Sequence, residues 1–186
     1  MPVGRYARHV VPRLRQETRE VVILARDMYG TAYGIANDPT AGSYFNSPYW
    51  SFDPDTVQGI GADAKLPPNR VYGTPLKFRF VYTIPTGPGG GNVVWRLDWL
   101  IRNKGNWINV VPNTSIIVHK TLSRGQLMVT DPIIIKAHEV DIQDLGGSGQ
   151  PVNLQLGIIR QADDVNDTET APAYLFKLLM EYTAWV

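Results

Sequence analysis

From residue 76 onward, apolar and polar side chains alternate over short segments that end at glycine or proline. In the first segment, residues 76–82, every second side chain is large and apolar, and Pro85 ends the pattern. A period of two places these side chains on one face of an extended chain, which is typical of a half-buried β-strand. Similar patterns predict further strands at residues 93–101, 114–122, 126–130, 133–135, 152–158 and 174–185.

These segments follow one another at short intervals, whereas a parallel sheet would need helices between its strands. We therefore predict an all-β protein, an antiparallel jelly-roll-like β-sandwich with an extended N-terminal arm. The glycine-rich run 86–91 is predicted to join the strands at 76–82 and 93–101 as a hairpin. Because proline cannot donate to a β-ladder, Asp131-Pro132 predicts an edge, a bulge or a crossing between sheets.

The first 70 residues have a weaker pattern. The apolar and largely β-branched run Val21–Leu24 favours a strand at residues 19–28 over the helix that residues 13–28 would otherwise suggest. Residues 30–70 mix aromatic side chains with turn-forming residues, which suggests an arm that docks on a partner, or one or two short strands. We accordingly expect two parts, an N-terminal arm with an irregular aromatic-rich segment at 1–70 and a β-sandwich domain at 71–186.

The composition excludes several classes of protein. With no cysteine, the chain has no disulfide, no thiolate metal site and no thiol nucleophile. Its formal net charge of +1 argues against a dedicated nucleic-acid binder. No segment approaches the roughly 20 apolar residues of a membrane span, and the arginine-rich N-terminal region lacks the apolar core of a signal peptide. We expect a protein made in a cytosol, with no nucleic-acid or membrane partner.

No motif nominates an active site, so we assign no catalytic residue, no metal and no cofactor. His9, His119 and His138 show no ligand spacing, and the favoured interpretation is surface or hydrogen-bonded strand histidines. The glycine run lacks the lysine of a phosphate-binding loop. One acidic cluster suggests either a calcium site or, as we prefer, a solvated turn, because it lacks the ligand spacing of an EF-hand. The cluster consists of Asp163, Asp164, Asp167 and Glu169.

Two segments are candidates for binding. The first carries four aromatic residues near Asn and Asp side chains, which suits a sugar-binding platform, although packing of the rings on the sandwich or on a neighbouring subunit is the favoured interpretation. The second is the arginine-rich N-terminal segment, which suits an ordered protein interface, with an unanchored terminus as the alternative. The aromatic candidates are Tyr44, Tyr49, Trp50 and Phe52. The arginine candidates are Arg5, Arg8, Arg13, Arg15 and Arg19.

The C-terminal strands carry a recognisable set of short motifs. These are residues 95–99 (Trp-Arg-Leu-Asp-Trp), 156–160 (Leu-Gly-Ile-Ile-Arg), Asp163-Asp164, Asp167-Thr168 and 173–175 (Ala-Tyr-Leu). With them, residues 75–186 resemble a β-sandwich module of tailed-bacteriophage structural proteins, as found in head-decoration and tail-associated domains.

The resemblance implies a non-enzymatic virion protein that is assembled in the host cytoplasm. The function that the resemblance implies first is that of a homotrimeric capsid decoration, or cement, protein. Such a protein binds the outer surface of the major capsid protein and stabilises the head. The alternative is a tail- or fibre-associated module that recognises a host surface glycan through the aromatic segment. A sugar-active enzyme on the same fold is a third reading, and the sequence nominates no pair of carboxylates for it.

Overall fold

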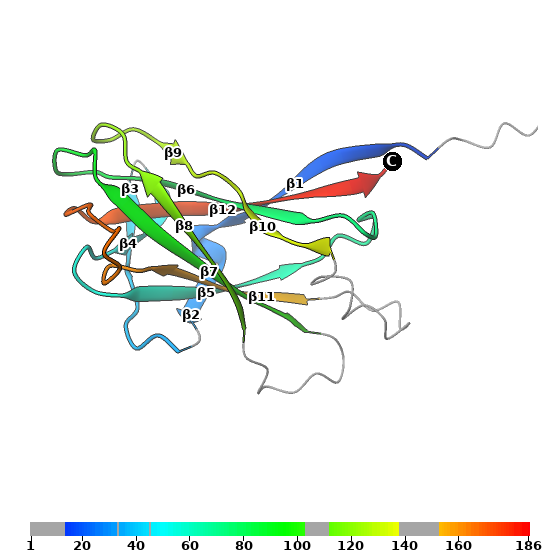
Figure 1. Cartoon of the computed structure of the whole chain (residues 1–186), viewed down its shortest axis with the longest axis horizontal. Coiled ribbons are helices and arrows are strands. Elements are labelled where there is room, and N and C mark those ends of the chain that lie inside the picture. The colour runs from blue at the N-terminus through cyan, green and yellow to red at the C-terminus, as the bar shows by residue number, and fades with distance from the viewer. Residues whose placement is uncertain (1–13, 33, 45, 103–111, 138–152) are drawn as a thin grey trace, which may run out of the picture.

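The protein is a sandwich of two antiparallel β-sheets, which confirms the predicted fold class (Figure 1). The computed structural model describes residues 14–32, 34–44, 46–102, 112–137 and 153–186. In these residues, seven strands form one sheet, here called sheet A, and five form the other, sheet B. No helix within the described ranges is long and apolar enough to span a membrane.

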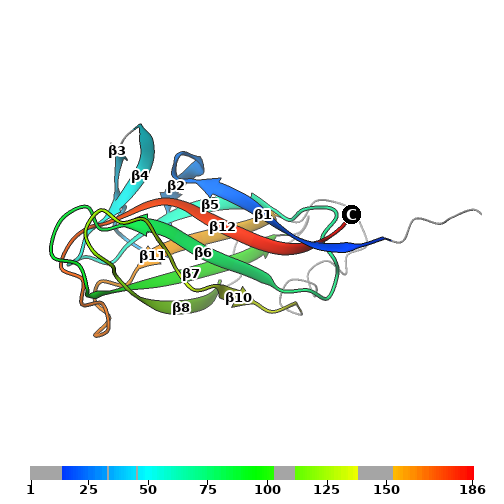
Figure 2. The same ribbon diagram turned by 90° about the horizontal axis from the view of Figure 1, so that it is seen from above.

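Sheet A is built around its longest strand, β12 (Ala173–Trp185). On one side β12 pairs with β6 (Leu76–Thr83), which in turn pairs with the short strands β9 (Met128–Val129) and β10 (Ile133–Ile135). On its other side β12 pairs with β1 (Gln16–Leu24) along one part and with β4 (Ser47–Phe52) along another. β4 forms a hairpin with β3 (Thr40–Tyr44), which stands away from the sandwich (Figure 2).

Sheet B has the order β2-β5-β11-β7-β8. Its strands are β2 (Met28–Thr31), β5 (Gln58–Lys65), β7 (Asn92–Arg102), β8 (Asn113–Lys120) and β11 (Asn153–Arg160). A 3₁₀ turn, η1 (Ala25–Asp27), carries the chain from β1 in sheet A to β2 in sheet B. Sheet B therefore combines strands from both halves of the sequence.

Alternation places the large apolar side chains between the two sheets. From β6, Phe78, Phe80 and Tyr82 point inward, and from β7, Trp95 does the same, each with none of its surface exposed. The Trp95 ring stacks on Phe80 at a centroid distance of 5.1 Å and meets Phe52 edge-to-face at 5.1 Å. Aromatic pairs at such distances add to the stabilisation from burial, so the rings packed around Trp95 stabilise the core.

The predicted hairpin between the strands at 76–82 and 93–101 is wrong. Both strands exist, but β6 lies in sheet A and β7 in sheet B, so the glycine run crosses from one sheet to the other. Gly89 has a φ of 68°, and a Cβ on Gly91 would come within 2.8 Å of the Thr168 carbonyl oxygen. The crossing places the large side chains of the two strands on the facing inner surfaces of the two sheets.

The first 70 residues contribute more strands than the one or two expected in the irregular segment. Residues 16–65 contribute β1 to β5, which pair with β11 and β12 from the other end of the chain. The strand expected at 19–28 is present but begins at Gln16 and ends at Leu24. Asp131-Pro132 separates two short strands on the outer edge of β6, which matches the edge interpretation.

Candidate functional site

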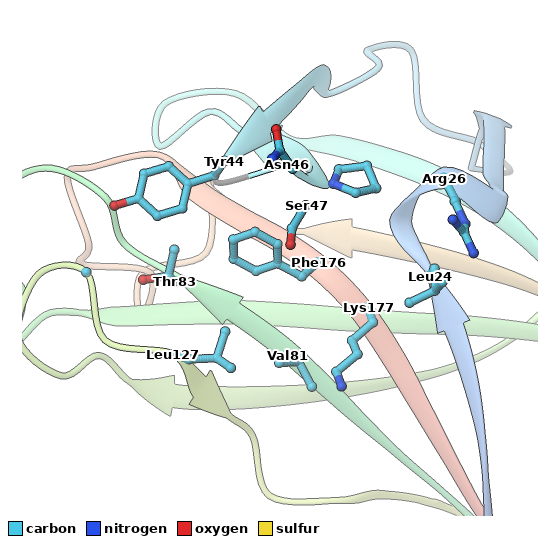
Figure 3. Close-up of a pocket in the computed structure, with 12 residues that line it drawn as sticks. Leu24, Arg26, Tyr44, Asn46, Ser47, Val81, Thr83, Leu127, Phe176 and Lys177 are labelled. Carbon is cyan, nitrogen blue, oxygen red and sulfur yellow. The ribbon is translucent and has the colours of Figure 1, made fainter.

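A groove lies on the outer face of sheet A, beneath the β3–β4 hairpin (Figure 3). β6 and β12 form its floor, and the hairpin, the end of β1 with η1, and the loop before β9 form its walls. Its volume of about 510 Å³ falls within the range of small-molecule sites, roughly 300–1,000 Å³. The lining residues are Leu24, Arg26, Tyr44, Asn46, Ser47, Pro48, Val81, Thr83, Gly125, Leu127, Phe176 and Lys177.

A β-bulge in β12 gives the groove two of its side chains. The pairing of β12 with β6 shifts register between Leu175 and Lys177. As a result, Phe176 and Lys177 both escape burial, although they are consecutive, while Leu175 and Leu178 point into the core with no exposed surface. A bulge re-aims a side chain in this way, and here it places an aromatic ring beside a cation on the groove floor.

The hairpin supplies the opposite wall. Asn46 turns the chain with a φ of 62°, a left-handed conformation that asparagine tolerates. The Tyr49 ring lies across Gly42 on β3, where a Cβ would overlap it, and stacks on Tyr174 at 4.0 Å with an interplanar angle of 9°. The pKa of the Tyr49 hydroxyl is raised, chiefly by its hydrogen bond with Tyr174. This packing fixes the hairpin over sheet A.

The four aromatic candidates have different environments. Tyr44 is 40% exposed and lines the groove opposite Phe176. Tyr49 packs between β12 side chains, and Trp50 donates its indole N–H to the Ala25 carbonyl oxygen at 2.8 Å. The prediction that Phe52 could bind a glycan is wrong, because its ring is fully buried against Trp95 and presents no face to a ligand. The structure thus leaves Tyr44 as the groove residue of this set.

The two arginine candidates that the structure describes, Arg15 and Arg19, do not line the groove. Arg5, Arg8 and Arg13 lie outside the described residues. Arg15 precedes β1 and lies 3.2 Å from Glu17, and Arg19 lies on β1 at 3.9 Å from the same carboxylate. Both arginines are exposed, one just before and one on the edge strand β1, and their binding to a partner stays a prediction.

Sequence reasoning missed Phe176 and Lys177. The core residues of β12 are Ala173, Leu175, Leu178, Met180, Tyr182 and Ala184. Their spacing is two, except for a step of three between Leu175 and Leu178. This interruption is the signal of a bulge and would have predicted two consecutive outward side chains.

A second polar cluster is buried at the end of the sandwich where β11 stops. Arg160 and Asp167 form a bidentate ion pair, at 2.8 and 3.1 Å, with both side chains completely buried. Glu169 is also buried and accepts a hydrogen bond from the Thr121 hydroxyl at 2.7 Å. The preferred interpretation of this acidic stretch as a solvated turn is therefore wrong for Asp167 and Glu169, while Asp163 is exposed.

Of the three histidines, the one that the structure describes has a structural partner. The Tyr82 hydroxyl lies 2.8 Å from Nδ1 of His119, whose pKa is lowered by burial. His119 is thus a hydrogen-bonded strand histidine, as predicted, whereas His9 and His138 lie outside the described residues. Within the described ranges, no group of three or more His, Asp or Glu side chains is arranged to hold a metal ion.

Comparison with known proteins gives similarity to solved structures only. No family model matches the sequence, and no curated protein matches it. The chain is similar to the CBM22-2 xylan-binding domain of Xyn10C from Paenibacillus barcinonensis, with 16% identity and a TM-score of 0.48 over 89% of this chain and 99% of that domain.

Two further solved structures have a similar arrangement. The mannan-recognising carbohydrate-binding module TmCBM27 is 8% identical, with a TM-score of 0.43 over 90% of this chain and 98% of the module. A chain of the infectious bursal disease virus Gt strain is 14% identical, with a TM-score of 0.40, and this chain spans 36% of its length. Such likeness concerns the fold alone, and the relation to tailed-bacteriophage proteins stays a prediction.

Proposed function

We propose that this protein is a non-enzymatic carbohydrate-binding β-sandwich of a virion, a tail- or fibre-associated module that recognises a host glycan. The observation that carries the proposal is the groove, where Tyr44 and Phe176 present aromatic rings beside the polar side chains of Asn46 and Ser47. Sugars bind to such sites through their apolar ring faces, while their hydroxyl groups find donors and acceptors at the rim.

The groove suits binding better than catalysis. Glycoside hydrolysis commonly needs a pair of carboxylates that flank the scissile bond. None of the described residues that line the groove is acidic. The virion context is supported by the resemblance of residues 75–186 to phage structural modules, and binding in the groove is supported independently by its geometry.

The test is a glycan array followed by calorimetry with the full chain. We expect Tyr44→Ala and Phe176→Ala each to weaken binding of the captured glycan by about tenfold, because each removes one aromatic contact face. Tyr72→Ala is the matched control, since Tyr72 is 61% exposed and lies outside the groove. Unchanged affinity in both groove variants would place the sugar site elsewhere, and an array without any bound glycan would reject the proposal.

A second candidate function, capsid decoration, is favoured by an exposed apolar surface. β8 of sheet B and β10 of sheet A approach one another at the open side of the sandwich, where β9 also pairs with β6. Four β-branched side chains there, here called the apolar edge, are about half exposed: Ile116, Val118, Val129 and Ile134. Exposed apolar side chains that gather near a sheet edge favour a protein partner such as the major capsid protein.

Co-sedimentation with capsids that lack this protein tests the second function. We expect Ile116→Asp combined with Ile134→Asp to abolish association with capsids, because the charges would have to be desolvated in the interface. Val165→Asp is the control, because Val165 is 89% exposed on another loop. Retained association of the double variant would exclude the apolar edge as the attachment surface. Immunogold labelling of virions distinguishes the two functions, through label on the head or at the tail tip.

A further inference from the structure

Positive charge is concentrated at the end of the groove away from Tyr44. The Lys177 and Arg26 side chains both line this end (Figure 3). Arg26 has a nearby carboxylate, Asp27, at 3.9 Å from its Nε atom. Lys177, in contrast, forms no salt bridge with any residue in the part of the chain that the structure describes.

The strands around Lys177 leave its charge uncompensated. Its direct cross-strand neighbours are Leu24 on β1 and Val81 on β6, both apolar. In the next row Leu179 lies between Val22 and Arg79, which adds a further cation to this face.

The nearest carboxylates along the three strands lie one row further on. There, Glu181 faces Glu20 on one side and Lys77 on the other, and its carboxylate is 2.7 Å from the Lys77 ammonium. The Glu181 carboxylate is therefore already paired with another lysine, Lys77. A half-buried ammonium with apolar neighbours interacts more strongly with a ligand charge than one in open water does.

We infer that the ligand of the groove is an acidic sugar, whose carboxylate or sulfate binds Lys177 while its ring lies against Phe176. The inference rests on the proposed glycan-binding function and adds the charge of the ligand. The ammonium group is a compact positive charge with three N–H donors on a flexible stem, so it suits an anionic group at the edge of a sugar ring. A neutral sugar of the same shape would bury the ammonium without an ionic partner, which costs affinity.

The experiment compares matched acidic and neutral glycans. The full chain is applied to an array of oligosaccharides that contain uronic acids, sialic acids or sulfated sugars, each printed beside its methyl ester or unsulfated parent. Calorimetry then gives the affinity of the best pair for the wild-type chain, Lys177→Gln and the control Lys65→Gln. Lys65 is exposed at the end of β5 in the other sheet, so the control removes the same charge far from the groove.

We expect the acidic form to bind about tenfold more tightly than its neutral counterpart, and this preference to weaken as salt is raised. Lys177→Gln should abolish the preference, while Lys65→Gln should keep it. Equal binding of both forms by the wild-type chain would overturn the inference and leave the proposed glycan binding intact. A preference that survives in Lys177→Gln would also overturn it, and binding to no glycan at all would reject both proposals.

Discussion

At the scale of single residues, Arg160 explains what the C-terminal motif does. Its guanidinium has five N–H groups, and five hydrogen bonds are present. Two go to the Asp167 carboxylate, and three go to the carbonyl oxygens of Phe52, Glu169 and Ala171. One side chain thereby ties the end of β4 to the segment that leads into β12. The arginine and the aspartate of the motif are therefore structural residues, and the motif by itself specifies a fold and no ligand.

This arrangement makes a stability prediction. Asp167→Asn and Arg160→Leu should each lower the free energy of unfolding by about 3–5 kcal/mol, because each leaves a buried charge without its partner. The double variant Arg160→Leu with Asp167→Asn should cost less than the two single costs added together. Urea denaturation measures all three. The exposed pair of Arg15 and Glu17 is the control, where Glu17→Gln should change stability by less than about 1 kcal/mol. Additive costs at Arg160 and Asp167 would contradict the coupling.

At the scale of elements, strands were predictable where large apolar residues alternate. β6, β7, β11 and β12 follow that pattern closely. β5 was missed because its inward residues beyond Ile60 are the alanines 62 and 64, which give a weak hydrophobic signal. β3 and β4 were missed because their stability comes from contacts with β12 and with each other, such as the stacked Tyr49 and Tyr174, which no local pattern reveals.

Strand pairing was less predictable than strand location. A short glycine-rich loop between two alternating segments is compatible with a hairpin and with a crossing between sheets, because both need tight turns. The choice depends on partners that lie far away in sequence, here β12 for β6 and β11 for β7. The bulge in β12 is an intermediate case, since its three-residue step is visible in the sequence but its role as a groove floor is not.

At the scale of the whole molecule, the groove could not be predicted from any one segment. Its walls and floor come from residues between 24 and 177, which the sandwich brings together. Sequence analysis found Tyr44 because its segment is locally rich in aromatic residues. It could not pair Tyr44 with Phe176, because the two side chains line one groove only once β4 has paired with β12.

The same long-range pairing predicts how the chain responds to truncation. Deleting residues 1–30 would remove β1, and with it the core side chains Ile23, Ala25 and Met28, which are at most 5% exposed. Lost burial of the isoleucine and the methionine alone costs about 3–6 kcal/mol, a large part of the stability of an ordinary domain. The melting temperature should therefore fall by at least about 10 °C, or the protein should become insoluble.

Deleting only residues 2–13 tests the function of the arm without removing a strand of the sandwich. The strand β1 and its pairing with β12 remain complete in this shorter deletion, so scanning calorimetry should give a melting temperature within a few degrees of wild type. Arg5, Arg8 and Arg13 are absent from it, so its binding to capsids tests the predicted arm without unfolding the sandwich. For the longer deletion, the contradicting result is different: if the chain without residues 1–30 melts at the wild-type temperature, β1 is not an integral strand of sheet A.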